Sequence, residues 1–522
     1  MDSKPGTSAD RTLLRPTRRE LLQLGGMGLL AASLPGRLLA QGETPVRGGS
    51  LRVAFTGSSA SATMDPHRVT LSVDTCRCPM TFDTLIGVDA DGKLVNRLAE
   101  SMEANSDATE WTIRLRDAAF HNGKKLTAAD VIFTFRRIMD PANPGFGAAG
   151  LAAVDPNGMS AVDDRTVKVK MLHPYSIFPE ILSSFYLYGI VPEGFDVNAP
   201  VGTGPFVLKS FAPQERSVHV RFDGYWGNVP HLDEVIVIDS FKNENAAFDA
   251  LRAEEVDAYA AVPTQLAKRV INDAKGPIKA LLSAPALWQP FCMRVDIAPF
   301  NDPDVRLAMK LLVDREQFVK LAMSGLGETA SDLFSPADPD FDHSLVRTRD
   351  LDQAKFLLKK AGAEGLTFDL NTSELSSGMI QGAQVFARQA ADAGVTVNVK
   401  QMPVDLYFQE YFPWPMAQDF WLYSPYMSQV SQSMIPGAPY NETRWDHPEY
   451  NALFNDMMKS TDPAKRTETV HAMQRIEFDQ GGYIIPGHLQ TVDLHSDKVK
   501  GLISGKTGYS FANFDFTGAW MA

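Results

Sequence analysis

Alternating apolar and polar residues predict several β-strands along the chain. In residues 48–55 (GGSLRVAF) and 110–120 (EWTIRLRDAAF), apolar side chains recur at every second position. Residues 165–172 (RTVKVKML) and 233–240 (DEVIVIDS) show the same pattern. Because a period of two places successive side chains on opposite faces of a strand, each segment is predicted to be a strand with one buried face.

Residues 122–138 combine a turn with the start of a helix. Asn122-Gly123 supplies the turn, and Thr127 is a residue type that caps helices, with Asp130 favourably placed in the first turn. Apolar side chains then recur at helical spacing and are predicted to face inward: Val131, Phe135 and Ile138.

Later segments carry helical patterns, or strands that alternate with helices. Residues 301–323 predict one or two helices that begin at an Asn/Asp cap, and residues 350–362 and 464–482 predict further helices ending at glycines. Residues 366–402 read as strand, helix and strand, with Gly394 closing the helix. This mixture predicts an α/β or α+β protein without internal repeats.

Length and charge narrow the class of protein. A chain of 522 residues is too long for one hydrophobic core, so two or three domains are expected. The formal net charge of −13 argues against nucleic-acid binding, which usually needs a basic surface, and it is compatible with cationic ligands.

Residues 1–40 differ from the rest and predict a cleaved export signal. They carry six basic and three acidic residues, and the adjacent Arg18-Arg19 precedes a glycine-broken apolar run that is shorter than the ~20 residues of a membrane span. The pair resembles a twin-arginine signal, with cleavage expected after Ala40. The alternative is an ordinary amphipathic first helix. Without a cysteine at the cleavage region, we expect a soluble periplasmic protein that is not lipid-anchored.

The three cysteines, Cys76, Cys78 and Cys292, are expected to be interior thiols. A bridge between residues only two apart would be strained, and a metal site would want more cysteines or a nearby histidine.

Catalytic and cofactor motifs are absent from the sequence. Residues 501–508 (GLISGKTG) resemble a phosphate-binding loop, but three residues separate its first two glycines where four are needed. Pro205 in VGTGPF (201–206) indicates a tight turn, and neither a Gly-x-Ser-x-Gly nor a His-Glu-x-x-His motif occurs. We therefore predict no enzymatic activity, no metal and no cofactor.

Five segments, taken in order, resemble the oligopeptide-, dipeptide- and nickel-binding proteins, the extracytoplasmic solute-binding components of ABC importers. They are FHNGKKLTAADVIFTFRRI, VGTGPFVLKSF, YWGNVPHLDEVIV, PFNDPDVRLAMKLLVDREQFV and DLDQAKFLLKKAG. The resemblance extends over the mature chain. It implies an α/β bilobal periplasmic-binding-protein fold, a hinged trap with an extra family-specific domain, three domains in all.

The resemblance also implies domain limits. Lobe one would comprise 41–87, 203–290 and 490–522, the extra domain 88–202, and lobe two 291–489. Two chain crossings near 286–296 and 484–495 would form the hinge.

The function implied is that of a monomeric receptor which captures a peptide-like or other small polar solute and delivers it to the permease subunits of an ABC importer in the inner membrane. Peptides, opines, sugars and metal chelates remain open as ligands. The alternatives are a secreted hydrolase of oligosaccharide or peptide and a chemosensory or chaperone binding protein.

Residues 407–427 (YFQEYFPWPMAQDFWLYSPYM) contain nine aromatic residues and, in the resemblance, lie at the ligand cleft. Peptide-binding relatives carry an aspartate there, in a pattern like Trp-x-x-Asp-Tyr, that holds the ammonium of the peptide. The corresponding run here is Tyr423-Ser424-Pro425-Tyr426-Met427, so a tyrosine stands in its place. We expect Phe408, Phe412 and Phe420 in the core. The candidate ligand-binding residues are Trp414, Trp421, Tyr423 and Tyr426, joined by Trp288, Phe291, Tyr440 and Asn441.

Arg294 is the last candidate, since many relatives have asparagine there. Its guanidinium could bind a ligand carboxylate or phosphate, or it could form a structural ion pair across the hinge.

Overall fold

A seven-stranded sheet organises the two ends of the chain. Its strand order is β12-β21-β11-β1-β10-β9-β8, with β1 parallel to β10 and β11 and the other pairs antiparallel. The strands are β1 (Ser50–Thr56), β8 (Phe206–Ala212), β9 (Arg216–Arg221), β10 (Glu234–Phe241), β11 (Ala258–Tyr259), β12 (Ile278–Leu282) and β21 (Val492–Ser496). The strands predicted from residues 48–55 and 233–240 are thus confirmed.

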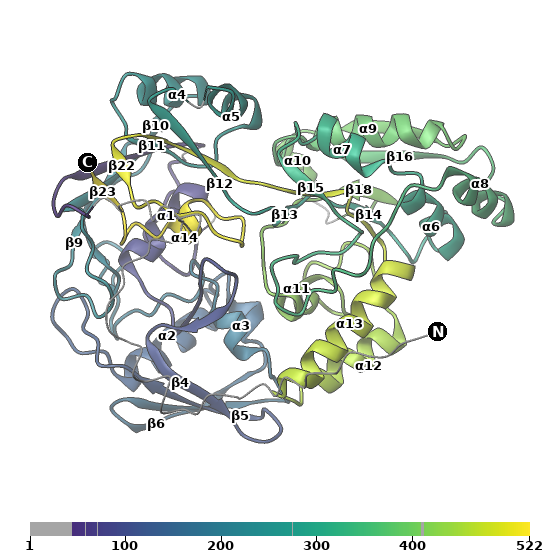
Figure 1. Ribbon diagram of the computed structural model, residues 1–522. Coiled ribbons are helices and arrows are strands. Elements are labelled where there is room, and N and C mark those ends of the chain that lie inside the picture. Colours follow the sequence, from purple (N-terminus) through teal and green to yellow (C-terminus); the bar gives the residue numbers. More distant parts are fainter. Residues whose placement is uncertain (1–43, 58, 70, 274, 409–411) are drawn as a thin grey trace, which may run out of the picture. The chain divides into compact units, whose positions relative to one another are not determined.

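The two faces of this sheet are covered by different helices. Leu51, Val53 and Phe55 pack in one apolar cluster with residues of α1 (Ser72–Thr81) and α14 (Phe511–Phe514), whereas Ala54 packs with α4 (Glu244–Arg252) and α5 (Thr264–Ile271). Figure 1 shows α4 and α5 together beside β10 and β11. This is the alternation that a period of two predicts.

This computed structural model describes residues 44–57, 59–69, 71–273, 275–408 and 412–522. The predicted export signal and its cleavage position lie outside these residues. Residues Pro45–Ala522 form one compact unit. No helix within the described ranges is long and apolar enough to cross a membrane.

A four-stranded antiparallel sheet, in the order β4-β5-β7-β6, forms a second layer with α2 (Ala128–Ile138). Its strands are β4 (Ala99–Ala104), β5 (Glu110–Leu115), β6 (Val154–Asp163) and β7 (Thr166–Met171). A capping box between Thr127 and Asp130 starts α2, as predicted. The inward-facing residues of α2 are fully buried, also as predicted: Val131, Phe135 and Ile138.

The third sheet has five strands in the order β17-β16-β18-β14-β19. They are β14 (Phe291–Met293), β16 (Thr367–Thr372), β17 (Thr396–Gln401), β18 (Met416–Gln418) and β19 (Tyr483–Ile484). The predicted strand–helix–strand is β16, α9 (Met379–Ala391) and the parallel β17, and Gly394 has the positive φ expected after a helix end. Residues 301–323 form two helices, α6 (Pro303–Leu311) and α7 (Arg315–Leu321).

Two chain segments connect the seven-stranded and five-stranded sheets and run antiparallel to each other. One passes from β12 through β13 (Leu287–Trp288) to β14, and the other from β19 through β20 (Gly487–Leu489) to β21. Pairing of β12 with β21, β13 with β20 and β14 with β19 joins them along their length. The crossings predicted near 286–296 and 484–495 fall on these segments. The domain limits derived from the resemblance stay a prediction.

The remaining elements are short or peripheral to these sheets. They are β2 (Ile86–Val88), β3 (Leu94–Asn96), η1 (Ala148–Leu151), α3 (Phe178–Leu182), β15 (Gly327–Thr329), α8 (Leu351–Lys360), α10 (Val404–Tyr407), α11 (Tyr426–Ser433), α12 (Pro448–Met457), α13 (Pro463–Gln480), β22 (Val499–Lys500) and β23 (Trp520–Met521). The helices expected at 350–362 and 464–482 are thus confirmed as α8 and α13.

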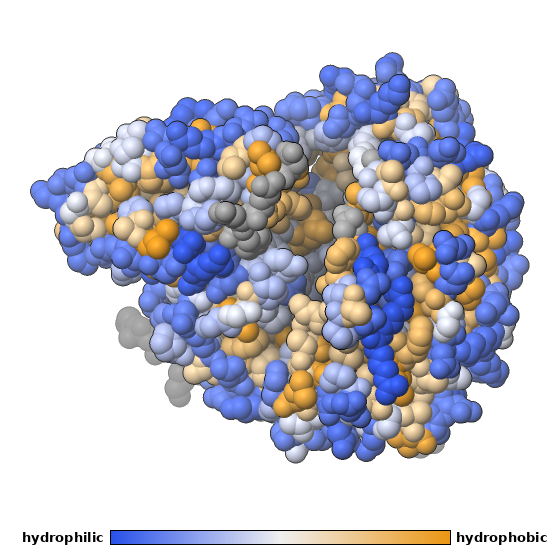
Figure 2. Space-filling model, turned by 180° about the vertical axis from the view of Figure 1, so that it is seen from behind, coloured by the Kyte–Doolittle hydropathy of each residue, from blue (hydrophilic) through white to orange (hydrophobic). Residues whose placement is uncertain are grey.

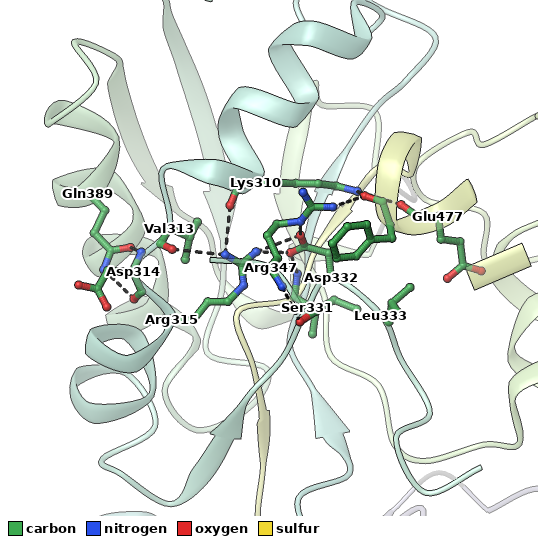
Figure 3. Close-up of polar contacts among 12 residues, drawn as sticks. Lys310, Val313, Asp314, Arg315, Ser331, Asp332, Leu333, Arg347, Gln389 and Glu477 are labelled. Carbon is green, nitrogen blue, oxygen red and sulfur yellow. Dashed lines mark hydrogen bonds and ion pairs between the residues drawn. The ribbon is translucent and has the colours of Figure 1, made fainter. Parts of the chain in front are cut away.

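Buried charges link α6, α7 and α13 beside the five-stranded sheet (Figure 3). Arg315 donates to both oxygens of Asp332 at 2.8 and 2.9 Å, and Arg347 forms an ion pair with the same carboxylate at 2.6 Å. Lys310 donates to the main-chain oxygen of Glu477 at 3.0 Å, and its burial lowers the pKa of the ammonium to about 7.

All three cysteines are buried free thiols, as expected. Burial raises the pKa of each thiol far above its ordinary value, which keeps Cys76, Cys78 and Cys292 protonated and unreactive.

Candidate functional site

A cavity of about 1240 Å³ lies among three stretches of chain that are far apart in the sequence. Its wall comes from residues 146–188, 420–459 and 507–513, with Val69 and Val88 added. Figure 2 shows a hollow in the surface of the molecule, with both hydrophilic and hydrophobic side chains around it. A cavity of this size is large enough for a small organic solute or a short peptide.

Aromatic side chains from all three stretches line the cavity. They are Phe146, Tyr175, Phe185, Tyr186, Tyr188, Phe420, Trp421, Tyr423, Tyr440, Phe454 and Tyr509. Phe185 meets Tyr509 edge-on with 5.0 Å between ring centroids, and the hydroxyl of Tyr509 donates to the main-chain oxygen of Tyr423 at 3.2 Å. These contacts hold the wall segments together, so aromatic rings from distant parts of the chain border one space.

Trp421 is the outermost ring of a four-ring stack that runs from the cavity wall into the core. Its ring stacks on Trp288 with centroids 5.8 Å apart and 12° between planes. Trp288 stacks on Phe334 at 5.2 Å, and Phe334 stacks on Tyr426 at 5.2 Å. A pair of main-chain hydrogen bonds between Trp288 and Trp421, of 2.9 and 3.1 Å, fixes the outer end. The stack therefore orients Trp421 from behind.

Buried carboxyl groups hold both ends of this stack. The indole Nε1 of Trp421 donates to Glu442 at 3.0 Å, and the hydroxyl of Tyr426 donates to Glu477 at 2.5 Å. Burial is the main cause that raises the pKa of Glu442 to about 8 and that of Glu477 to about 7. The charge of nearby Asp419 raises the pKa of Glu442 further.

Exchanging Glu442 for glutamine is expected to stabilise the protein at alkaline pH relative to the wild type. Because the pKa of the folded-state carboxyl is raised above its ordinary value, wild-type stability is lost as pH rises from about 4.5 to about 8. Glutamine cannot ionise and still accepts from Trp421. Urea unfolding should show the difference between variant and wild type growing by more than ~1 kcal/mol from pH 5 to pH 9. An equal difference in the free energy of unfolding at pH 5 and pH 9 would contradict ionisation of Glu442 as the cause.

One further buried carboxylate, Glu180 of α3, belongs to the cavity wall. Arg466 of α13 donates to its Oε1 at 2.5 Å and also pairs with Asp338 at 3.4 Å and Asp340 at 2.7 Å. Burial raises the pKa of Glu180 to about 7.

Three of the nine predicted ligand-binding residues line the cavity, and six do not. Trp421, Tyr423 and Tyr440 belong to its wall. Trp288 and Tyr426 are fully buried in the ring stack, and Phe291 is buried against Phe386 with ring centroids 4.6 Å apart. None of the three lines the cavity, because aromatic packing in the core buries their side chains.

The other three residues off the wall have local partners. Trp414 packs on the ring of Tyr407 at 5.5 Å. The Asn441 side-chain amide bonds to the main chain of Trp445 at 2.8 Å. Arg294 makes a forked pair with Asp296 at 2.7 and 2.6 Å and also donates to the main-chain oxygen of Phe412 at 3.3 Å. Its ion pair is therefore local and does not cross the hinge, and Arg294 does not line the cavity.

Two of the three phenylalanines expected in the core are instead exposed. Phe412 is buried as predicted, but Phe408 is 42% exposed, and Phe420 is 37% exposed and lines the cavity. Some aromatic residues of 407–427 therefore pack in the core and others line the cavity, but they are not the ones expected for each role.

The part of the wall formed by residues 146–188, including Tyr175, Glu180 and Tyr188, was not predicted from the sequence. The run SSFYLYGI (183–190) is rich in aromatic residues and was the available signal. For metals, no three His, Cys, Asp or Glu side chains gather into a ligand set anywhere in the described ranges.

Comparison with known proteins defines the class. The family model of bacterial extracellular solute-binding proteins, family 5 Middle, matches residues 93–442. The glutathione-binding protein GsiB of Pectobacterium atrosepticum is 27% identical, in a match that covers 94% of this chain and 98% of that protein.

Solved structures show the same fold. The periplasmic binding protein DppA of Helicobacter pylori, in complex with peptide STSA, matches with a TM-score of 0.75 and 23% identity over 91% of this chain and 98% of that one. The oligopeptide-binding protein AppA of Bacillus subtilis, in complex with a nonapeptide, matches with a TM-score of 0.72 and 19% identity over 92% of this chain and 100% of that one.

The fold is therefore the α/β bilobal fold of periplasmic binding proteins with an extra domain, as predicted. The chain belongs to family 5 of the bacterial extracellular solute-binding proteins.

Proposed function

We propose that the protein captures a peptide-like or other small polar solute in the aromatic cavity and delivers it to the permease subunits of an ABC importer. The observation that carries this proposal is the cavity itself, whose wall combines three distant chain segments around the supported ring of Trp421. The names of the relatives, which include glutathione- and peptide-binding proteins, support the ligand class. We further propose that it acts without catalysis, as a periplasmic monomer exported through a twin-arginine signal.

Closure around the solute would occur at the paired connecting segments. The strands β13 and β20 are short and lie between two sheets with cores of their own, so a small change of backbone angles there can reorient one sheet against the other. A solute that touches wall residues from both 146–188 and 420–459 would stabilise the closed arrangement by the difference in its contacts between the two states.

Trp421, Tyr423 and Tyr440 are the proposed ligand-binding residues among the nine predicted from sequence. Tyrosine and tryptophan combine a large apolar face with a polar edge, and they order with little loss of side-chain entropy. The six residues off the wall are proposed to support them or to pack elsewhere.

Native mass spectrometry of the protein, purified from an exporting host without refolding, tests the proposal first. We expect one bound small solute per chain. In calorimetry with that solute, Trp421→Ala should weaken binding roughly 10- to 100-fold, since central aromatic residues often contribute about 2 kcal/mol or more.

The control for this titration is Phe356→Ala on α8, which removes a ring that is 59% exposed and does not line the cavity. It should bind like the wild type. Equal affinity of Trp421→Ala and wild type would contradict the assignment of the cavity.

A further inference from the structure

The carboxylate of Glu180 is only half satisfied by the protein. Its Oε1 accepts from Arg466, and the main-chain N–H of Ser428 also acts on the carboxyl group, while its Oε2 is buried and makes no hydrogen bond of good geometry. The residue is 7% exposed and belongs to the cavity wall. A buried acceptor left without a donor is costly, so the free oxygen indicates a donor that comes with the ligand.

The hydroxyl of Tyr423 is a second buried polar group on the same wall without a partner. Tyr423 is 6% exposed, and the charges of Glu180 and Asp338 act on its hydroxyl, which places the three groups near one another. A donor bound to Glu180 would therefore also have the phenolic oxygen of Tyr423 close by as an acceptor.

Charge balance around these two groups is negative. A single guanidinium, Arg466, faces three carboxyl groups, Glu180, Asp338 and Asp340. An excess of carboxylates next to a dehydrated cavity favours a positive group in the ligand.

The described wall offers little to an anion. Besides Glu180, its charged or titratable side chains other than tyrosine are His173 and Lys459, and both are exposed. Lys459 is paired with Asp456 at 3.0 Å. A ligand carboxylate in the interior would thus lose its hydration without gaining a cationic partner, which is strongly unfavourable.

We infer that the cavity selects a cationic solute whose ammonium group binds Glu180 Oε2 and the Tyr423 hydroxyl among aromatic rings, and which carries no carboxylate to be buried. This rests on the proposed function and specifies its ligand class. Aromatic rings add cation–π attraction to the same ammonium. Glutathione, with its two carboxylates, is expected to bind poorly.

Three forms of one tripeptide test the inference by calorimetry at neutral pH. Ala-Phe-Ala amide carries one ammonium, the free acid adds a carboxylate, and the N-acetylated amide has no charge. The amide should bind at least tenfold more tightly than either of the others and than glutathione. Equal or tighter binding of the free acid, the acetylated amide or glutathione overturns the inference, and so does a lack of binding by the amide at millimolar concentration.

A matched pair of variants assigns the effect to Glu180. Glu180→Gln keeps an acceptor for Arg466 but removes the charge, and it should weaken amide binding at least tenfold. Asp340→Asn removes a charge that also pairs with Arg466 but does not line the cavity, and it should change the affinity for the amide less than threefold. Thermal unfolding should show both variants folded. Similar losses in both variants contradict a direct contact with Glu180.

The pH profile separates a direct contact from a structural role. Since the pKa of Glu180 is raised to about 7, lowering the pH from 7 to 5 protonates it, and wild-type affinity for the amide should fall. The charged groups around Glu180 are Arg466, Asp338 and Asp340, and they remain in Glu180→Gln, whose profile should be flat. Free-acid or glutathione binding that depends on Trp421 would overturn this inference and leave the receptor function standing, whereas no solute in native spectra would count against both.

Discussion

Replacing Trp288 by alanine is expected to lower the free energy of unfolding by about 3–5 kcal/mol. Trp288 is 1% exposed and stacks between Trp421 and Phe334, with Tyr483 meeting its edge at 5.4 Å. Its removal would leave a large cavity beside the strands that connect two sheets, where neighbouring rings cannot collapse without breaking the stack. Equilibrium urea unfolding, monitored by far-UV circular dichroism, measures the loss.

Phe420→Ala is the control for Trp288→Ala, because it also removes an aromatic ring from the vicinity of the cavity but from an exposed position. It should cost less than ~1 kcal/mol. A Trp288→Ala protein as stable as this control would show that the ring stack does not support the fold.

Replacing Asp332 by asparagine is expected to destabilise the protein by about 3–5 kcal/mol. Its buried carboxylate balances both Arg315 and Arg347, and its Oδ1 also accepts from the main-chain nitrogen of Ile485 at 3.1 Å. The substitution leaves two buried guanidinium groups without a counter-charge. Asparagine tolerates the positive φ of 65° at this position, so the effect reports charge and not backbone strain.

Urea unfolding at neutral pH measures this loss as well. Asp369→Asn is the matched control, since Asp369 lies on the same five-stranded sheet and pairs with Lys400 only at the surface, 3.8 Å away. The control should change stability by less than ~0.5 kcal/mol. Equal effects of the two substitutions would contradict the role assigned to the buried network.

Local signals in the sequence predicted the elements well. The cap at Thr127, the alternation in β1 and the glycine after α9 all depend on residues within a few positions of one another, and the structure has each of them. Such features follow from backbone and side-chain geometry that a single segment already contains.

The wall of the cavity could be predicted only in part, because it depends on contacts between distant segments. Trp421 and Trp288 are both tryptophans, and nothing local in the sequence indicates which one faces the cavity. Their pairing across 133 positions (421 − 288) decides it. Glu180 lies in a short helix without a marked pattern, and its partner Arg466 is 286 residues away.

Arg294 was more predictable than it seemed. The sequence Arg294-Val295-Asp296 places a carboxylate two residues from the guanidinium, and a turn begins at Val295, just after β14. The forked local pair follows from that spacing.

Small-angle X-ray scattering with and without the solute that the protein retains tests most directly whether it closes around a ligand. The paired connecting strands and the wall shared by distant segments predict a smaller radius of gyration at saturation, and Trp421→Ala should need a higher solute concentration for the same change. Identical scattering curves for the free protein and the saturated protein would contradict capture by closure.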